Sequence, residues 1–310
     1  MVPIIEVEQL VKRYRGAQVN AVDGISFKVD AGEFFTFLGP NGAGKTTTIS
    51  ILTTTLSPTS GTARVAGFDL ARQASSVRQN VGIIFQQPSL DMNLTAEENI
   101  RFHAVLYGLY PFRPLFSMMP RPYRQQVHDL AALLGLQDEI AKPVKKFSGG
   151  MRRKLEIMRS LMHRPRVLFL DEPTAGLDPV SRRDLWQYLR QVRRESGTTV
   201  FLTTHYLEEA EEADSICIIN HGRIVAQGSP QEVKARLIER YVLIDADDRA
   251  RLRDELKALG MGFTETPLFR IDLDERGVQG VIKSINTPLS VVKTHVPSLE
   301  DAYLEIVGQE

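Results

Sequence analysis

The chain has 310 residues, 43% of them hydrophobic and 25% charged, which is the composition of an ordinary globular protein long enough for two domains. Its 38 lysines and arginines balance its 38 aspartates and glutamates, so no overall field would draw it to nucleic acid or to an anionic membrane. A single cysteine, Cys217, excludes an internal disulfide and fits a reducing compartment.

The first residues, MVPIIEVEQL, lack the basic and then apolar pattern of a signal peptide. No apolar run anywhere in the sequence reaches about eighteen residues, which is the length needed to cross a bilayer. We therefore expect no membrane-spanning segment in this chain.

A short apolar strand, EFFTFL at 33–38, runs directly into the glycine-rich stretch GPNGAGKTT at 39–47. The phosphate-binding pattern G-x-x-x-x-G-K-[ST] is met by Gly39, Gly44, Lys45 and Thr46. In such a loop backbone N–H groups meet phosphate oxygens, the lysine reaches the β- and γ-phosphates, and the threonine hydroxyl binds Mg²⁺. An ordinary glycine-rich turn is the alternative. It is disfavoured because strand, loop and lysine all fall where phosphate binding needs them.

The stretch PFRPLFSMMPRPYRQQV at 111–127 follows a helical pattern and contains four prolines, which prevent one continuous helix. It is also rich in large apolar side chains, and it carries three arginines and no acid. Two interpretations remain open. The loop either folds back and buries its aromatic rings on its own subdomain, or it presents them to a partner.

In residues 147–165, FSGGMRRKLEIMRSLMHRP, Phe147 is followed by a serine suited to cap a helix and by two glycines that let phosphate approach the backbone. An amphipathic helix is predicted to follow. We interpret its basic stretch, MRRKLEIMR, as a solvated helix face rather than a nucleic-acid contact. The acidic run EEAEEAD at 208–214 receives the same interpretation, a solvated face.

An apolar strand followed by two carboxylates and a proline is found in VLFLDEP at 167–173. A strand end of this kind can present Asp171 to a Mg²⁺ shell, while Glu172 holds the water that attacks the γ-phosphate. A strand that ends in a solvated acidic turn is the alternative interpretation of this segment alone.

Further β-rich apolar runs lie between helical patterns up to about residue 228, which predicts an α/β core with a largely parallel sheet. The runs are GISFKV at 24–29, VGIIF at 81–85, TTVFLTT at 198–204 and SICIIN at 215–220. The stretch QGSPQEV at 227–233 should stop a strand and start a helix. After it, residues 241–296 predict the order strand, helix, strand, helix, strand, a small α+β module.

Five segments together resemble the motifs of ATP-binding cassette (ABC) ATPase subunits, in their order and approximate spacing: GPNGAGKTT, FSGGM, VLFLDEP, AGLD at 175–178 and TTHY at 203–206. The resemblance covers residues 1 to about 235. It implies a P-loop NTPase cassette of the α/β class, with a RecA-like core, an antiparallel β subdomain and a helical subdomain. The signature departs from the family pattern at Phe147, usually leucine, and at Met151, usually glutamine.

The same resemblance implies ATP and Mg²⁺ as ligands and gives site residues by position. The implied catalytic residues are Lys45, Gln86, Glu172 and His205. Contacts to ATP would come from Tyr14 against adenine and from the loop residues Gly39, Pro40, Asn41, Gly42, Ala43, Gly44, Lys45, Thr46 and Thr47. A second copy would contribute Ser148, Gly149 and Gly150, with Asp178 in the loop that communicates across the pair. Metal ligands would be Thr46, Gln86 and Asp171. Gln87 is adjacent, and Gln86 is chosen by its place in the family pattern.

The closing segment VPSLEDAYLEIVG at 296–308 resembles the ending of daunorubicin-resistance and nodulation-type exporter subunits. Its Ser298 is predicted to cap the last helix. We expect an ABC ATPase domain at 1–235 and a small C-terminal α+β accessory domain at 236–310.

The expected function is therefore ATP hydrolysis in a transporter, with export favoured and a drug, antibiotic, lipid or polysaccharide as cargo. The implied assembly is a homodimer of cassettes on a separate permease, in a 2+2 arrangement at the cytoplasmic face of the membrane, without nucleic acid. The alternative is a soluble ABC ATPase of translation or DNA repair, although the paired cassettes or long coiled coil of those classes are absent from this sequence. A GTPase would need an N-K-x-D motif, which the sequence lacks.

Overall fold

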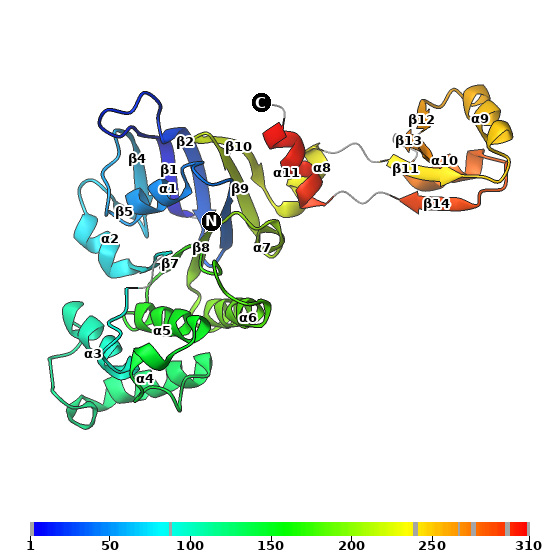
Figure 1. The fold of residues 1–310 in the computed structure, drawn as a ribbon. Coiled ribbons are helices and arrows are strands. Elements are labelled where there is room, and N and C mark those ends of the chain that lie inside the picture. The colour runs from blue at the N-terminus through cyan, green and yellow to red at the C-terminus, as the bar shows by residue number, and fades with distance from the viewer. Residues whose placement is uncertain are drawn as a thin grey trace. The chain divides into compact units, whose positions relative to one another are not determined.

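The computed structural model describes residues 3–86, 89–237, 241–265, 267–273, 277–294 and 298–308. The chain forms two compact units, residues 1–229 and 230–310, and each is described by itself (Figure 1). Gln87 and residues 296–297 of the closing segment lie outside the described residues.

A six-stranded sheet forms the centre of the larger unit, with the strand order β10-β9-β3-β8-β7-β6. The strands from β9 to β6 run parallel, and β10 at the edge is antiparallel to β9. The strands are β3 (Phe34–Leu38), β6 (Val81–Ile84), β7 (Val167–Asp171), β8 (Thr199–Thr204), β9 (Ser215–Asn220) and β10 (Arg223–Gly228). Every residue of β3, β7 and β8 is buried, as in parallel strands covered on both faces. The prediction of a largely parallel sheet is confirmed.

A second sheet in this unit is antiparallel and has the order β2-β1-β4-β5. Its strands are β1 (Pro3–Lys12), β2 (Val22–Asp30), β4 (Ser60–Val65) and β5 (Phe68–Asp69). Phe27 of β2 lies with its ring centroid 5.5 Å from those of Phe35 and Phe37 of β3. These aromatic contacts join the two sheets into one apolar core. Cys217 of β9 lies in the same core and is fully buried.

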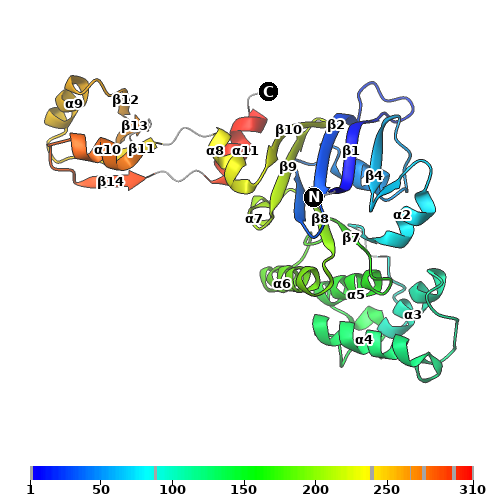
Figure 2. The same cartoon turned by 180° about the vertical axis from the view of Figure 1, so that it is seen from behind.

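The helices described in the larger unit fall into two groups. Four accompany the sheets: α1 (Lys45–Leu52), α2 (Ala74–Asn80), α6 (Pro179–Ser196) and α7 (Leu207–Glu211). Three form a helical group that lies below the sheets in Figures 1 and 2, where α6 is seen beside α5: α3 (Ala96–Leu106), α4 (Arg121–Leu134) and α5 (Gly149–Leu161). Short 3-10 turns are η1 (Phe116–Met118) and η2 (Val144–Lys146). Both α3 and α4 pack against α5. Tyr123 of α4 is fully buried, and its hydroxyl donates a hydrogen bond to the carboxylate of Glu97 of α3 at 2.9 Å.

The segment 111–127 joins α3 to α4 without a continuous helix, as its prolines predicted. Part of this loop folds back onto its own subdomain, as the first interpretation predicted, and whether the rest meets a partner stays a prediction. Met119 is 2% exposed, and Phe116 is half-buried with its ring 6.1 Å from that of Tyr123. The side chains that remain more than half exposed are Phe112, Leu115 and Met118.

The smaller unit contains a four-stranded antiparallel sheet in the order β12-β13-β11-β14. Its elements are β11 (Tyr241–Asp245), α9 (Arg249–Ala258), β12 (Phe263–Glu265), β13 (Phe269–Asp272), α10 (Gly277–Ser284) and β14 (Val291–Thr294). This βαββαβ order is a ferredoxin-like arrangement. The strand-helix-strand-helix-strand order expected from the sequence was wrong, because it missed the three-residue strand β12.

Two helices complete the smaller unit and pack against each other, α8 (Pro230–Leu237) and α11 (Leu299–Gly308). The predicted strand stop and helix start at 227–233 are confirmed, since β10 ends at Gly228 and α8 begins at Pro230. Ser298 accepts a hydrogen bond from the N–H of Asp301 at 3.1 Å, which confirms its prediction as the cap of the last helix. Within the described ranges, no helix is long and apolar enough to cross a membrane.

Candidate functional site

Four neighbouring parallel strands bring the predicted residues to one edge of the central sheet. The glycine-rich loop follows β3, Gln86 follows β6, Glu172 follows β7 and His205 follows β8. The carboxyl ends of parallel strands meet at the same edge, so residues far apart in the sequence converge there. A hollow of about 360 Å³ at this edge is lined by Ala21, Asn41, Gly42, Gly44, Lys45, Thr46, Thr47, Gln86 and Glu172.

The loop 39–44 is shaped by its glycines. A side chain at Gly39 would lie 2.3 Å from the carbonyl oxygen of Ile219, and one at Gly44 would lie 2.4 Å from that of Ala21. Gly44 also has a φ of 109°, a left-handed conformation that favours glycine. It stands at the start of α1, and no described side chain caps that helix end. The N–H groups of the first turn of α1 have no carbonyl partner within the helix and can donate hydrogen bonds to an anion such as phosphate.

Lys45 is the cation of this loop and is 5% exposed. Its ammonium group donates to the carbonyl oxygens of Gly39 at 2.7 Å and Pro40 at 3.1 Å. It also lies 3.3 Å from Oε1 of Glu172. The loop backbone therefore holds a fixed positive charge at the side of the hollow where phosphate oxygens would lie.

Glu172 is the point at which the other predicted catalytic side chains meet. Gln86 donates its Nε2–H to Oε2 of Glu172 at 3.2 Å, and Nδ1 of His205 lies 3.3 Å from Oε1. Glu172 has a φ of 44°, which is uncommon for a residue with a side chain. The arrangement holds a carboxylate, an amide and an imidazole around one small space, where they can orient a water molecule.

The residues predicted as metal ligands supply oxygen atoms that suit Mg²⁺. Asp171 is 2% exposed and accepts a hydrogen bond from the Thr203 hydroxyl at 2.5 Å, whereas Thr46 is exposed at the hollow. Among the described residues, no three His, Cys, Asp or Glu side chains form a group that could hold a metal ion by themselves. Mg²⁺ is commonly held by one or two protein oxygens together with substrate phosphates and water.

Tyr14 lies on the loop after β1 and is 46% exposed. Its hydroxyl is 3.2 Å from Oγ1 of Thr47, in the first turn of α1. The ring therefore stands close to the glycine-rich loop with much of its surface free, as stacking on a base would require.

The signature residues and Asp178 do not line this hollow in the part of the chain that is described. Ser148 and Gly149 are exposed at the start of α5, where Ser148 accepts a hydrogen bond from the N–H of Met151 at 3.2 Å. Asp178 caps α6 by accepting from the N–H groups of Val180 and Ser181, both at 3.0 Å. Hydrogen bonds from the hydroxyl and N–H of Ser181 lower the pKa of Asp178.

The two helix starts pack together. A Cβ at Gly150 would lie 2.8 Å from the hydroxyl oxygen of Ser181, so a larger residue at the second signature glycine would crowd the start of α6. Cap formation by Asp178 was missed in the sequence, although an aspartate directly before Pro179 is a common helix start.

Two charged runs predicted to be solvated are partly buried, and that interpretation was wrong for three of their residues. Arg153 is 6% and Glu156 is 1% exposed on α5, and Glu209 on α7 is 2% exposed. Glu209 accepts hydrogen bonds from the hydroxyls of Thr174 and Thr204. Burial raises its pKa, although those two hydrogen bonds act in the opposite direction. Through these two hydrogen bonds, Glu209 connects the segment after Glu172 to the segment before His205.

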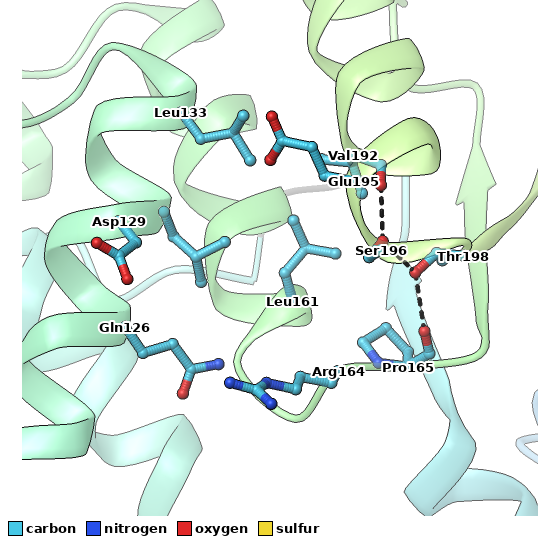
Figure 3. A pocket seen from close by; sticks show the side chains of 11 residues that line it. Gln126, Asp129, Leu133, Leu161, Arg164, Pro165, Val192, Glu195, Ser196 and Thr198 are labelled. Atoms are coloured by element: carbon cyan, nitrogen blue, oxygen red, sulfur yellow. Dashed lines mark hydrogen bonds between the residues drawn. The ribbon is translucent and has the colours of Figure 1, made fainter.

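A separate pocket of about 450 Å³ lies between α4, the end of α5 and the end of α6 (Figure 3). Leu161 and Val192 give it an apolar floor, and Asp129, Arg164 and Glu195 lie around it. The hydroxyl of Thr198 donates to the carbonyl oxygen of Pro165 at 3.0 Å at one side. None of the predicted site residues lines this pocket.

Comparison with known proteins gives three findings. The family described as ABC transporter matches residues 22–175. The daunorubicin/doxorubicin resistance ATP-binding protein DrrA of Streptomyces peucetius is 39% identical over 98% of this chain and 92% of its own length. The Nod factor export ATP-binding protein I of Ralstonia nicotianae is 37% identical over 99% of this chain and 95% of its own length.

Solved structures agree with this comparison. One described as the ATP-binding subunit of an ABC transporter is 29% identical to this chain, with a TM-score of 0.64. The alignment covers 75% of this chain and 92% of that one.

Proposed function

This chain belongs to the family of ABC transporter ATP-binding subunits and is an ABC ATPase, and from that premise we propose that it powers export through a separate membrane protein. The observation that carries the proposal is the convergence of Lys45, Gln86 and His205 on the carboxylate of Glu172, which lines the hollow beside the glycine-rich loop. The names of the relatives, which refer to drug resistance and Nod factor export, favour a drug, antibiotic, lipid or polysaccharide as the exported compound.

Within the hollow, we propose that backbone N–H groups at the end of the glycine-rich loop and in the first turn of α1, together with the ammonium group of Lys45, bind the phosphates of ATP. Tyr14 stacks on the base. Glu172 accepts a proton from the attacking water, and the contacts of Gln86 and His205 with its carboxylate keep that carboxylate directed at the water. His205 also reaches the γ-phosphate.

Thr46, Gln86 and Asp171 would hold Mg²⁺ at the same edge. A magnesium ion bound there would neutralise negative charge on the phosphate oxygens. The buried Asp171 is oriented for this by the hydroxyl of Thr203.

The active unit that we propose is a pair of identical chains. Ser148, Gly149 and Gly150 stand at the start of a helix of 13 residues, and Ser148 and Gly149 are exposed and outside the hollow. Such a helix start favours an anion. The phosphate that meets these residues is therefore the one bound to a second copy, with Asp178 beside the contact between the two chains.

We further propose that residues 1–235 act as the ATPase domain and residues 236–310 as an accessory domain. Two such chains would bind a dimeric permease at the cytoplasmic face of the membrane, in a 2+2 assembly without nucleic acid. The exposed apolar side chains of the loop after α3 are suited to that contact.

Co-expression tests the proposal. The chain should move to the membrane fraction with a multi-helix membrane protein encoded beside it, and ATP hydrolysis by the pair should require Mg²⁺. If the chain stays out of the membrane fraction with every such protein and instead sediments with ribosomes or binds DNA ends, the translation or repair alternative is correct.

A further inference from the structure

Arg153 is a buried arginine on α5, one and a half turns after Ser148. Its guanidinium group donates four hydrogen bonds to atoms outside its own side chain. Two go to backbone carbonyl oxygens around Glu172, those of Pro173 at 2.9 Å and Asp171 at 3.3 Å. A third goes to the carbonyl oxygen of Phe85 at 2.7 Å, and the fourth to the carboxylate of Glu156 at 2.8 Å.

The first two bonds grip the backbone on both sides of Glu172. Glu172 has the left-handed φ of 44°, and a residue with a side chain keeps such a conformation only where its surroundings hold it. On the side of β8, Thr203 contributes, since its carbonyl oxygen accepts from the N–H of Glu172 at 3.1 Å. On the side of α5, Arg153 holds this backbone through its hydrogen bonds to the carbonyl oxygens of Asp171 and Pro173. The direction of the Glu172 carboxylate therefore depends on the position of α5.

The third bond reaches the residue directly before Gln86. The segment after Gln86 is tied to the same helix, because Glu156 accepts from the N–H of Ser89 at 3.0 Å. Arg159 donates to the carbonyl oxygen of Ser89 at 2.8 Å and to its hydroxyl at 2.6 Å. The side chains of Gln86 and Glu172 are hydrogen-bonded to each other at 3.2 Å in the hollow. The backbone segments that carry both of them are thus hydrogen-bonded to side chains of α5.

Burial of the guanidinium group of Arg153 costs free energy, because its charge must be removed from water. Burial lowers the pKa of Arg153, and the adjacent carboxylate of Glu156 opposes that shift. A guanidinium stays charged in proteins, and the planar donor fork of Arg153 reaches carbonyl oxygens of both loops at once.

We propose that Arg153 is a positioning residue through which the Ser148 end of α5 sets the geometry of Glu172 and Gln86. The inference rests on the proposed pairing of two chains, in which Ser148 meets the phosphate of one nucleotide while Glu172 acts on the other. Movement of α5 on binding of the partner's nucleotide is transmitted by Arg153 to the chain's own reacting groups. The two nucleotides of a pair are thereby coupled within each chain.

The test compares Arg153→Lys and Arg153→Met with the wild type, using Lys154→Met as a matched control. Lys154 lies on the same helix and is partly buried, but it contacts Tyr188 of α6 and not the loops of the hollow. We expect both Arg153 variants to bind ATP in the absence of Mg²⁺ within about threefold of the wild-type Kd. Their kcat should fall by about tenfold or more, with a smaller change in KM, and the Hill coefficient for ATP should approach one.

A double-mutant cycle separates positioning from general destabilisation. If Arg153 acts through Glu172, Arg153→Lys should have little further effect on single-turnover hydrolysis once Glu172→Gln is present. Additive losses in the cycle would contradict the proposal, as would an unchanged kcat and Hill coefficient in a folded Arg153→Met. If Arg153→Met does not fold, Arg153→Lys and the cycle still decide, because lysine keeps the charge beside Glu156. A wild-type protein that hydrolyses no ATP would instead overturn the proposed function, and the inference with it.

Discussion

The ammonium group of Lys45 lies 3.3 Å from the carboxylate of Glu172, and the two side chains are only 5% and 11% exposed. The cation expected to bind phosphate is thus paired with the carboxylate expected to activate water. Nucleotide binding must exchange part of this ion pair for contacts between Lys45 and phosphate oxygens. The pair accordingly opposes nucleotide binding, while it neutralises both charges.

Glu172→Gln should therefore have two effects of opposite sign. Hydrolysis should slow by about a hundredfold or more, since a neutral amide does not accept the proton of the attacking water. Affinity for ATP should stay the same or rise, because Lys45 no longer has a charged competitor, and an ATP-bound pair should accumulate. Phosphate release, equilibrium nucleotide binding and size-exclusion chromatography measure these effects. Glu195→Gln, at the exposed end of α6, serves as the control, and wild-type turnover in Glu172→Gln would refute the assignment.

Lys45→Ala should weaken nucleotide binding itself. The substitution removes the hydrogen bonds to the carbonyl oxygens of Gly39 and Pro40 and leaves Glu172 without its cation. Fluorescent nucleotide titration should show a loss of at least about tenfold in affinity. Lys142→Ala removes an exposed lysine paired with Glu139 and should leave the affinity unchanged. Equal affinities in both variants would show that the loop binds phosphate without its lysine.

Much of this site was predictable because its chemistry depends on short contiguous patterns. The loop at 39–47 and the strand before Asp171 each fix residue types at adjacent positions, and the parallel sheet then places their ends at one edge. What escaped prediction depends on contacts distant in the sequence. Arg153 and Glu209 lie in runs of charge that look solvated, and their burial follows from partners such as Phe85 and Thr174, far along the chain. Strand β12 escaped because three residues give no readable alternation.

The exposed part of the 111–127 loop should contribute to binding a membrane partner and not to stability. Replacing Phe112, Leu115 and Met118 together by serine removes side chains that are each more than half exposed. The melting temperature and ATP binding should stay unchanged, while co-purification with the membrane protein should fall. The control is Met119→Ser, because Met119 is buried and its loss should destabilise the chain by about 2–4 kcal/mol. A large loss of stability in the triple variant would show that these side chains are packed instead.

We expect the local stability of the smaller unit around Glu255 to depend on pH. The carboxylate of Glu255 accepts hydrogen bonds from the hydroxyl and N–H of Thr287 and from the N–H and side-chain amide of Asn286, at 2.5–3.0 Å. These hydrogen bonds lower the pKa of Glu255 from 4.5 to about 2, and the bond from the Thr287 hydroxyl has the largest effect. A depressed pKa stabilises the folded state above pH 4.5, and this contribution is lost as the pH falls through about 2.

Hydrogen exchange on the full chain can follow these hydrogen bonds at the amides of Asn286, Thr287, Leu289 and Ser290. At pH 6 the wild type should be better protected there than Glu255→Gln. The difference between the two proteins should shrink as the pH falls towards 2, because protonation of Glu255 makes the wild type resemble the variant. A difference that persists unchanged at pH 2 would contradict the assigned cause.

Cys217 makes the chain convenient for site-specific labelling. Its thiol is fully buried in β9, and burial raises its pKa, so it is a poor target for a maleimide, which reacts with an accessible thiolate. A cysteine placed at the exposed Ser117 of η1 would be the accessible thiol in the folded protein. A single spectroscopic probe can thus be attached to the loop after α3 without first removing the native cysteine.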